Sequence, residues 1–226
     1  MKNALFASLV AMTVTGPVAA ATNDHPTLRA IGGATAPTSL DARTTALLVI
    51  DFQNEYFSGK LPIPDGRKAL DQARKLVGFA DQHGIDVIHV RHITPAGSPV
   101  FAEGSNGAEI VDGIKPGKNH TLLTKNQVSV FASTDIDARL RAKGIKTLII
   151  SGLMTHACVA GAARDAVPLG YNVIVASDAV ATRPIDAFDG KGVVSAQDLH
   201  RAALTEISDA FATVEPTGDI LALPVN

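Results

Sequence analysis

The feature that most constrains the fold is the regular alternation of short apolar runs and amphipathic segments after residue 44. Runs of strand length occupy residues 46–50, 86–91, 147–151 and 172–177, and a shorter run at 211–214 predicts an edge strand. Helical spacing of apolar residues, or helix-capping residues, predicts helices over 67–83, 134–144, 155–169 and 195–210. Strands that are apolar throughout are buried on both faces of a sheet. The pattern therefore predicts a three-layer α/β/α fold with a mainly parallel sheet of five or six strands.

The first 44 residues have a different character. Residues 1–21 contain one lysine, an apolar run from Ala4 to Val14, and small residues at 18–21. This is the pattern of a secretory signal peptide, and a buried N-terminal helix is the alternative. We expect an extended arm over 22–44, a single domain over 45–226, and a periplasmic or secreted protein with no membrane segment in its mature form.

Composition excludes several classes of function. The formal net charge is −2, the chain has no Trp, and no basic patch stands out, so we expect no nucleic-acid partner. The single cysteine excludes an internal disulfide and a zinc site built from several cysteines. No G-x-G-x-x-G follows the first predicted strand and no G-x-x-x-x-G-K-[ST] occurs, so nothing in the sequence supports a nucleotide cofactor.

Two reactive residues follow predicted strands at the edge where parallel sheets bind their ligands. Asp51 follows the first strand, and Cys158 lies in the first turn of the helix after 147–151. The helix N-terminus there should lower the pKa of the thiol. If Thr155 is the N-cap, its hydroxyl bonds an amide at or near Cys158; the alternative is that this amide stays free for a substrate oxyanion. Each residue also has an ordinary interpretation: Cys158 as a small buried apolar residue, Asp51 as a turn residue, and Lys125 as a surface charge.

Three blocks in order, however, resemble a known family. They are Leu47–Asn54 with Tyr56 and Phe57, Lys125 followed by Phe131, and Gly152–Val159; residues 163–171 and 177–179 agree further. Over about residues 45–214 the chain resembles the isochorismatase-like cysteine hydrolases, which include nicotinamidases and related amidases.

The resemblance implies both a fold and a catalytic site. It implies the isochorismatase-like hydrolase fold, with Asp51, Lys125 and Cys158 as a catalytic triad. It also implies a cis peptide between Leu153 and Met154, which aims the amides of Met154 and Cys158 into an oxyanion hole. In these roles Asp51 takes the thiol proton, the thiolate attacks an amide carbonyl, and Lys125 lowers the pKa values of both anions.

Four further residues are expected from their positions to line the substrate pocket, although His156 also has the alternative of capping the strand–helix turn. They are Gln53, Phe57, Phe131 and His156.

The chain departs from the metal-binding branch of this family. Nicotinamidases hold a metal through an Asp-x-His motif after the second strand, and residues 89–94 read His-Val-Arg-His-Ile-Thr instead. His89 and His92 are three residues apart, so on a strand they point to opposite faces. We therefore expect no metal and no cofactor. Isochorismatases proper cleave a vinyl ether and lack the cysteine, so Cys158 also argues against that reaction.

The sequence thus predicts a metal-independent cysteine hydrolase that cleaves a C–N bond of a small amide or cyclic amide through a thioester. The alternatives are a periplasmic thiol redox sensor and a ligand-binding or scaffold protein on the same fold. The long irregular segment 94–120, rich in Gly and Pro, is expected to be a lid or an interface. We expect the protein to form a homo-oligomer.

Overall fold

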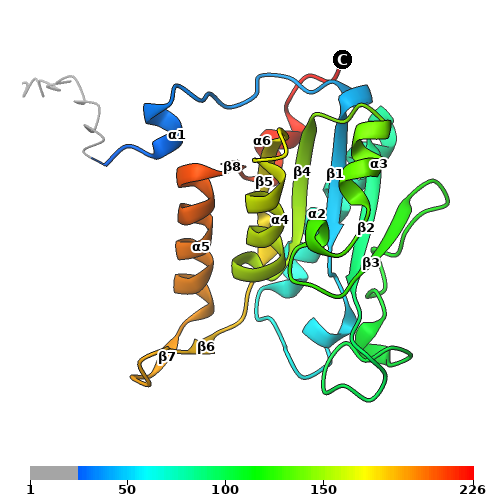
Figure 1. Ribbon diagram of the computed structural model, residues 1–226, viewed down its shortest axis with the longest axis vertical. Helices are drawn as coiled ribbons and strands as arrows, with labels where there is room; N and C mark the ends of the chain where they lie inside the picture. The colour runs from blue at the N-terminus through cyan, green and yellow to red at the C-terminus, as the bar shows by residue number, and fades with distance from the viewer. Residues whose placement is uncertain (1–24) are drawn as a thin grey trace, which may run out of the picture.

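A computed structural model describes residues 25–226 (Figure 1). The predicted signal peptide and the start of the arm lie outside these residues. Six strands form one sheet in which every neighbouring pair is parallel. In spatial order they are β3 (Thr121–Lys125), β2 (Asp86–His92), β1 (Thr45–Ile50), β4 (Thr147–Leu153), β5 (Asn172–Ala181) and β8 (Thr213–Glu215). The predicted sheet is confirmed.

Helices cover both faces of the sheet, which makes the fold a three-layer α/β/α sandwich (Figure 1). One apolar cluster joins a strand face to α2 (Gly66–His83) and α6 (Thr217–Leu221). A second joins the opposite face to α3 (Ile136–Ala142), α4 (Ala160–Ala166) and α5 (Ala196–Ala210). Adjacent strand residues such as Leu47 and Leu48 enter different clusters, as the alternation of side chains along a strand requires.

Local sequence signals set the ends of the two long helices. Gly84 adopts φ 70° and ends α2, as expected of glycine after the last helical turn. Ser195 caps α5 by accepting a hydrogen bond from the amide of Asp198. No helix within residues 25–226 is long and apolar enough to cross a membrane.

Several predicted elements need correction. β3 was not predicted because it is short and lies at the sheet edge, where exposed Leu122 breaks the pattern of a buried strand. The helix expected over 155–169 begins instead with a π-helical turn, η5 (Thr155–Val159), before α4. Asp135, rather than Thr134, precedes the first turn of α3. The arm contains a short helix, α1 (Leu28–Ile31), that the sequence did not indicate.

The remaining elements are short. Between β5 and α5 the chain forms a two-stranded hairpin of β6 (Ile185–Asp186) and β7 (Val193–Val194), which projects from the body of the molecule (Figure 1). Four 3-10 turns lie in connections: η1 (Ala42–Thr44), η2 (Asn54–Tyr56), η3 (Asn106–Ala108) and η4 (Val130–Ala132).

The strand order places a topological switch point between β1 and β4. The chain runs outward from β1 through β2 to β3, then returns to the other side of β1 and continues through β4, β5 and β8. Connections leave β1 and β4 in opposite directions, so their carboxyl ends border a crevice, the usual position of a ligand site in such sheets. Asp51 and the η5 turn both lie at this point.

Glycine at position 152 allows β1 and β4 to approach each other there. Gly152 pairs with Ile50, and a Cβ built on it would lie 2.6 Å from the Ile50 carbonyl oxygen. Its φ of 154° is also rare for residues that carry a side chain. Any larger residue must push the two strands apart beside the crevice.

We expect Gly152→Ala to destabilise the protein by about 1–3 kcal/mol, the usual cost of forcing an extra methyl into a packed site. Urea unfolding at constant pH measures the change. Gly78→Ala is the matched control: Gly78 is an exposed position of α2 with open space around its Cβ, so this change should stabilise by about 0.5–1 kcal/mol. Equal effects of the two substitutions would contradict the close-approach argument.

Candidate active site

Three side chains far apart in the sequence converge at the carboxyl edge of the sheet. The Lys125 Nζ lies 2.8 Å from Oδ2 of Asp51 and 3.3 Å from Sγ of Cys158. Asp51 is 0% exposed, Lys125 1% and Cys158 6%. The predicted triad residues are therefore brought into direct contact in a site almost closed to water.

Asp51 reaches the site because the backbone turns sharply after β1. Its φ is 54°, a left-handed conformation that aspartate tolerates better than most residues. Its amide donates to the Val90 carbonyl at 2.9 Å, and its own carbonyl accepts from the Gln53 amide at 2.8 Å. The turn is thus held from both sides, and the carboxylate is directed away from the strand.

Cys158 is presented by the η5 turn. The peptide bond between Leu153 and Met154 is cis, and the Met154 carbonyl accepts hydrogen bonds from the amides of Ala157 and Val159. The Thr155 hydroxyl contacts Nδ1 of His200 at 2.9 Å, and no cap hydrogen bond from a side chain precedes the turn. The expected N-cap role of Thr155 is therefore wrong, because its hydroxyl is used to join the turn to α5.

Lys125 comes from β3, two strands away from Asp51. Neighbouring strands are about 4.8 Å apart, a span that a lysine side chain can cross. Besides Asp51 and Cys158, its ammonium contacts Nδ1 of His92 at 3.0 Å and the Gln127 carbonyl at 3.1 Å. The Lys125 ammonium, which has three protons, is thus surrounded by four possible acceptors. The interpretation of Lys125 as a surface charge is excluded by this burial.

The pKa values of Cys158 and Asp51 are set by burial as well as by nearby charge. Burial, with the negative charge of Asp51, raises the pKa of the Cys158 thiol to about 12, and Lys125 opposes this only in part. Burial also raises the pKa of Asp51 above its usual value, against the opposing effect of Lys125. Lys125 lowers the pKa of both groups, as expected, but loss of hydration is the larger effect. The thiol pKa that the helix end was expected to lower is therefore raised.

Asp51 is the group placed to accept the thiol proton. Both of its carboxylate oxygens are buried, and neither accepts a conventional hydrogen bond from residues 25–226, although Lys125 lies at ion-pair distance. The Asp51 pKa also responds to the adjacent Cys158 side chain. A neutral thiol beside a carboxylate with free acceptor positions can transfer its proton without reaching bulk water.

Two of the expected pocket residues have contacts of their own within the protein. Gln53 is 0% exposed, and its side chain bonds the Ala108 carbonyl and both backbone groups of His92, so it ties the 94–120 segment to the end of β2. The ring of Phe131 lies 6.1 Å from that of Tyr171 and packs against the apolar cluster that includes Cys158. Contact of either side chain with a substrate stays a prediction.

The other two expected pocket residues remain near the crevice. The ring of Phe57 is half-buried beside the apolar cluster on the α2 face, with the Arg67 guanidinium 5.9 Å from its centre. Nδ1 of His156 contacts the Thr182 hydroxyl at 2.6 Å, which favours the structural role for this side chain. Contact of either residue with a substrate stays a prediction.

Three further residues near the site were not predicted from the sequence to belong to it. His92 touches Lys125, and Tyr56 is 2% exposed, with a pKa raised by burial and then by the charges of Asp51 and Cys158. Arg183 follows β5. The rule that ligands bind just beyond strand ends points to Arg183, but the strand was expected to end at Ser177, whereas it continues to Ala181.

His89, the other histidine of the 89–94 segment, belongs to a different cluster of polar side chains. Nε2 of His89 lies 3.1 Å from Nδ1 of His120, whose Nε2 contacts Asp81 at 2.8 Å. Burial lowers the pKa of His89 to about 4, so it is neutral at pH 7. Within residues 25–226 no group of three or more His, Cys, Asp and Glu side chains is arranged to hold a metal ion.

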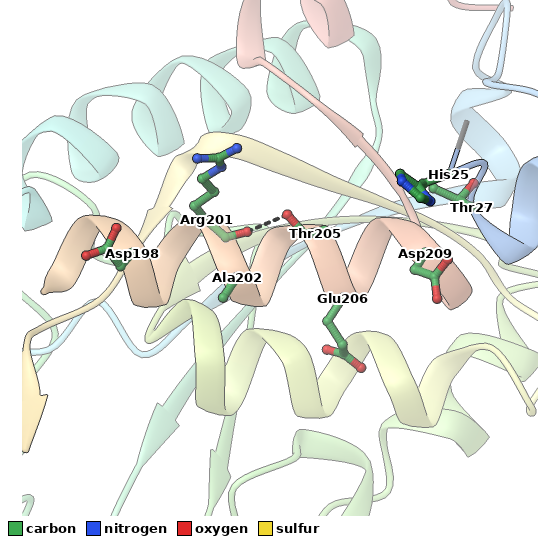
Figure 2. Close-up of a pocket in the computed structure, with 8 residues that line it drawn as sticks. All are labelled: His25, Thr27, Asp198, Arg201, Ala202, Thr205, Glu206 and Asp209. Atoms are coloured by element: carbon green, nitrogen blue, oxygen red, sulfur yellow. Dashed lines mark hydrogen bonds between the residues drawn. The ribbon is translucent and has the colours of Figure 1, made fainter. Parts of the chain in front are cut away.

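An open groove of about 630 Å³ lies along α5, away from the triad (Figure 2). None of the predicted site residues lines it. Its lining residues are His25, Thr27, Asp198, Arg201, Ala202, Thr205, Glu206 and Asp209.

Comparison with known proteins gives consistent matches over the domain. Residues 45–219 match the isochorismatase domain family. The chain is 36% identical over 176 residues to the uncharacterized isochorismatase family protein YddQ of Bacillus subtilis, covering 77% of this chain and 97% of the relative. It is 35% identical over 184 residues to the secreted isochorismatase effector Isc1 of Verticillium dahliae, covering 81% and 94%. A maleamate amidohydrolase of Pseudomonas putida is 29% identical over 195 residues, covering 79% and 86%.

Solved structures show the same similarity. An isochorismatase from Pseudomonas putida matches with a TM-score of 0.79 and 29% identity, covering 85% of this chain and 97% of that one. A cysteine hydrolase from Pseudomonas syringae matches with a TM-score of 0.76 and 27% identity, covering 83% and 96%.

We predict that Asp51→Asn lowers the pKa of the Cys158 thiol, because it removes the negative charge that helps to raise it. Lys125→Met should raise that pKa further. The rate of alkylation by iodoacetamide between pH 6 and 10, followed by intact mass, measures both effects, and the single cysteine makes the signal specific. The wild-type rate should still be rising at pH 10.

The control is Asp112→Asn, which removes an exposed carboxylate paired with Lys115 and should leave the alkylation profile unchanged. A wild-type plateau below pH 9, or a higher thiol pKa in the Asp51 variant, would contradict the electrostatic description of the site.

The His89 cluster predicts a loss of stability in acid. The His89 pKa is depressed in the folded state, so its stabilising contribution is complete above pH 6.5 and is lost as the pH falls towards 4. The lowering of the His89 pKa corresponds to about 3 kcal/mol of unfolding free energy. His89→Leu should therefore show a weaker fall of the unfolding free energy between pH 7 and 4 than the wild type, measured by urea titration. Parallel pH curves for the two proteins would refute this role of His89.

Proposed function

Because the chain belongs to the isochorismatase family of hydrolases, as its motifs predicted, we propose that it cleaves a C–N bond of a small amide with Cys158 as the nucleophile. The observation that carries the proposal is the single Lys125 ammonium in contact with both Asp51 and Cys158. The relatives named amidohydrolase support the bond type. No cofactor is required by the proposed chemistry.

The first half of the reaction forms an acyl-enzyme. Asp51 takes the proton of the Cys158 thiol, and the sulfur attacks the amide carbonyl carbon. The C–N bond then breaks, the nitrogen leaves with the proton from Asp51, and a thioester on Cys158 remains. We propose that the amides of Met154 and Cys158 hold the developing oxyanion; such donors contribute about 3–4 kcal/mol in comparable sites.

The second half restores the enzyme. Asp51 removes a proton from water, the hydroxide attacks the thioester carbonyl, and the C–S bond breaks. The sulfur regains its proton from Asp51 and the carboxylic acid product leaves. Lys125 keeps a positive charge beside the thiolate at each stage where it forms, which compensates for the burial that disfavours it at rest.

A Cys158 thiol that is protonated before the substrate binds is compatible with this mechanism. Since burial raises the Cys158 pKa to about 12, the sulfur of the free enzyme is a protonated thiol at pH 7. The nucleophile is then generated only when a carbonyl is in place to receive it. This arrangement also limits oxidation of the sulfur, because oxidation requires the thiolate.

Release of ammonia from a panel of primary amides tests the proposal. Cys158→Ala should remove turnover, and Asp51→Asn and Lys125→Met should each lower kcat/KM by at least about 1,000-fold, as loss of a nucleophile or its base does elsewhere. Intact mass after rapid acid quench should show an acyl adduct on the wild type and none on Cys158→Ala.

Lys143→Met provides the matched lysine control, since Lys143 is exposed and pairs with Asp86 on the surface. It should retain wild-type turnover. Equal ammonia release by the wild type and Cys158→Ala would remove the nucleophile from the proposal. Sulfenic acid on Cys158 under mild peroxide, without turnover of any amide, would favour the redox-sensor alternative, which no relative supports.

Export and self-association stay predictions. A relative named as a secreted effector is in keeping with an exported protein. The apolar hairpin residue Phe188 is fully exposed, as an interface residue of a homo-oligomer is in its isolated subunit.

A further inference from the structure

His92 is the last residue of β2, and its imidazole contacts the buried lysine of the site. Nδ1 of His92 lies 3.0 Å from Nζ of Lys125. A lysine ammonium has three donors and no acceptor, so Nδ1 must accept this hydrogen bond and the imidazole proton must lie on Nε2. Burial, and then the charge of Lys125, lowers the pKa of His92, which keeps the ring neutral at pH 7. The contact therefore requires the form of the ring that its surroundings favour.

The Lys125 ammonium has two kinds of partner. Oδ2 of Asp51 at 2.8 Å and Sγ of Cys158 at 3.3 Å gain and lose protons in the proposed reaction, so the strength of these two contacts changes from step to step. Nδ1 of His92 and the Gln127 carbonyl, at 3.0 and 3.1 Å, take no part in the proton transfers. These two acceptors are therefore constant, and they can hold the ammonium in place while charge moves between the acid and the sulfur.

The backbone of His92 is fixed by one buried side chain, that of Gln53. The His92 amide donates to Oε1 of Gln53 at 2.7 Å, and the His92 carbonyl accepts from Nε2 of Gln53 at 2.7 Å. The same Nε2 donates to the Ala108 carbonyl at 2.7 Å. Gln53 is 0% exposed, and its amide bonds the carbonyl of Asp51. The end of β2 is thus held against the turn that presents the Asp51 carboxylate.

The ring of His92 is packed against the segment 94–120. Phe101 lies edge-on to it, with ring centres 5.4 Å apart, and lies edge-on to Tyr56 as well, at 5.2 Å. Phe101 is 6% exposed and has a φ of 53°, a left-handed conformation that is strained for a bulky residue. Such a conformation is kept only where the surrounding structure holds it in place. The contacts that hold Phe101 therefore also fix the plane of the His92 ring.

We propose that His92 is a positioning residue for Lys125: its Nδ1 accepts a hydrogen bond from the ammonium and so keeps this group between Asp51 and Cys158. This inference rests on the proposed function, because it assigns a further residue to the same site. The imidazole acts through the ammonium and does not touch the reacting atoms. Its loss should therefore lower kcat and leave KM nearly unchanged.

Two substitutions separate the hydrogen bond of His92 from its packing. His92→Asn replaces the ring by an amide whose oxygen can take the place of Nδ1 as acceptor, whereas His92→Phe keeps a ring against Phe101 but has no acceptor. We expect His92→Phe to lower kcat by about 10- to 100-fold, the range for a hydrogen bond to a charged group, and to change KM by less than about threefold. His92→Asn should keep kcat within about threefold of the wild type. Steady-state release of ammonia measures both variants.

A role in packing alone predicts the opposite order, because His92→Phe would then retain activity and His92→Asn would lose it. Any result in which kcat of His92→Asn does not exceed that of His92→Phe overturns the inference. His83→Phe is the matched control: His83 is exposed in the last turn of α2, before the amino end of β2, and this variant should keep the wild-type kcat.

Urea unfolding of each variant shows whether it is folded. If His92→Phe does not fold, His92→Leu takes its place, since leucine is smaller and also lacks an acceptor. We expect the same loss of kcat from this variant, and a wild-type kcat would overturn the inference.

NMR spectroscopy tests the hydrogen bond without turnover. Nitrogen spectra of the imidazole rings at pH 8 should show the proton of His92 on Nε2, with the resonances assigned by their absence from His92→Asn. Lys125→Met should move the Nδ1 resonance of His92 downfield, because this nitrogen loses its donor. These results would support the inference even if no amide of the panel were hydrolysed, an outcome that counts against the proposed function alone. A proton on Nδ1, or an Nδ1 resonance indifferent to Lys125→Met, would overturn it.

Discussion

The candidate site depends on one buried ion pair, that between Lys125 and Asp51. A buried carboxylate or ammonium alone is strongly destabilising, so each residue requires the other and both require strands that keep them 2.8 Å apart. The same ammonium contacts Cys158, and the thiol therefore lies in an environment that disfavours its ionisation at rest and compensates its charge when it reacts. The pair thus links the stability of this edge of the sheet to its chemistry.

The parallel sheet explains how such a pair can be built from distant residues. Asp51, Lys125 and the η5 turn come from β1, β3 and β4, whose carboxyl ends meet at one edge. The switch in strand order leaves a crevice between β1 and β4, and Gly152 lets their backbones approach there. Extension of β5 to Ala181 brings Arg183 to the same edge. The charges of the site are therefore arranged by strand lengths and order more than by local sequence.

Apolar patterning predicted the sheet, its helical layers and the ends of α2 and α5, because these depend on burial and on local capping. It failed for β3, which is an edge strand with an exposed face, and for η5, whose π-helical hydrogen bonds leave no mark on the spacing of apolar residues. The motifs drew attention to Asp51, Lys125 and Cys158, which the structure brings into contact. The contacts of Gln53 and Phe131 could not be predicted, because the direction of a side chain after a strand depends on the turn that follows it.

The sequence by itself determined the class of fold and the family, and it singled out the candidate reactive residues, since each of these is carried by residue type and order along the chain. The tertiary structure alone decided the direction in which the pKa values of Asp51 and Cys158 shift. Whether the Cys158 pKa rises or falls depends on the balance between lost hydration and nearby charge, and both terms are set by distances between residues that are remote in sequence. For the same reason, only the folded chain shows that Lys125 is buried between Asp51 and Cys158.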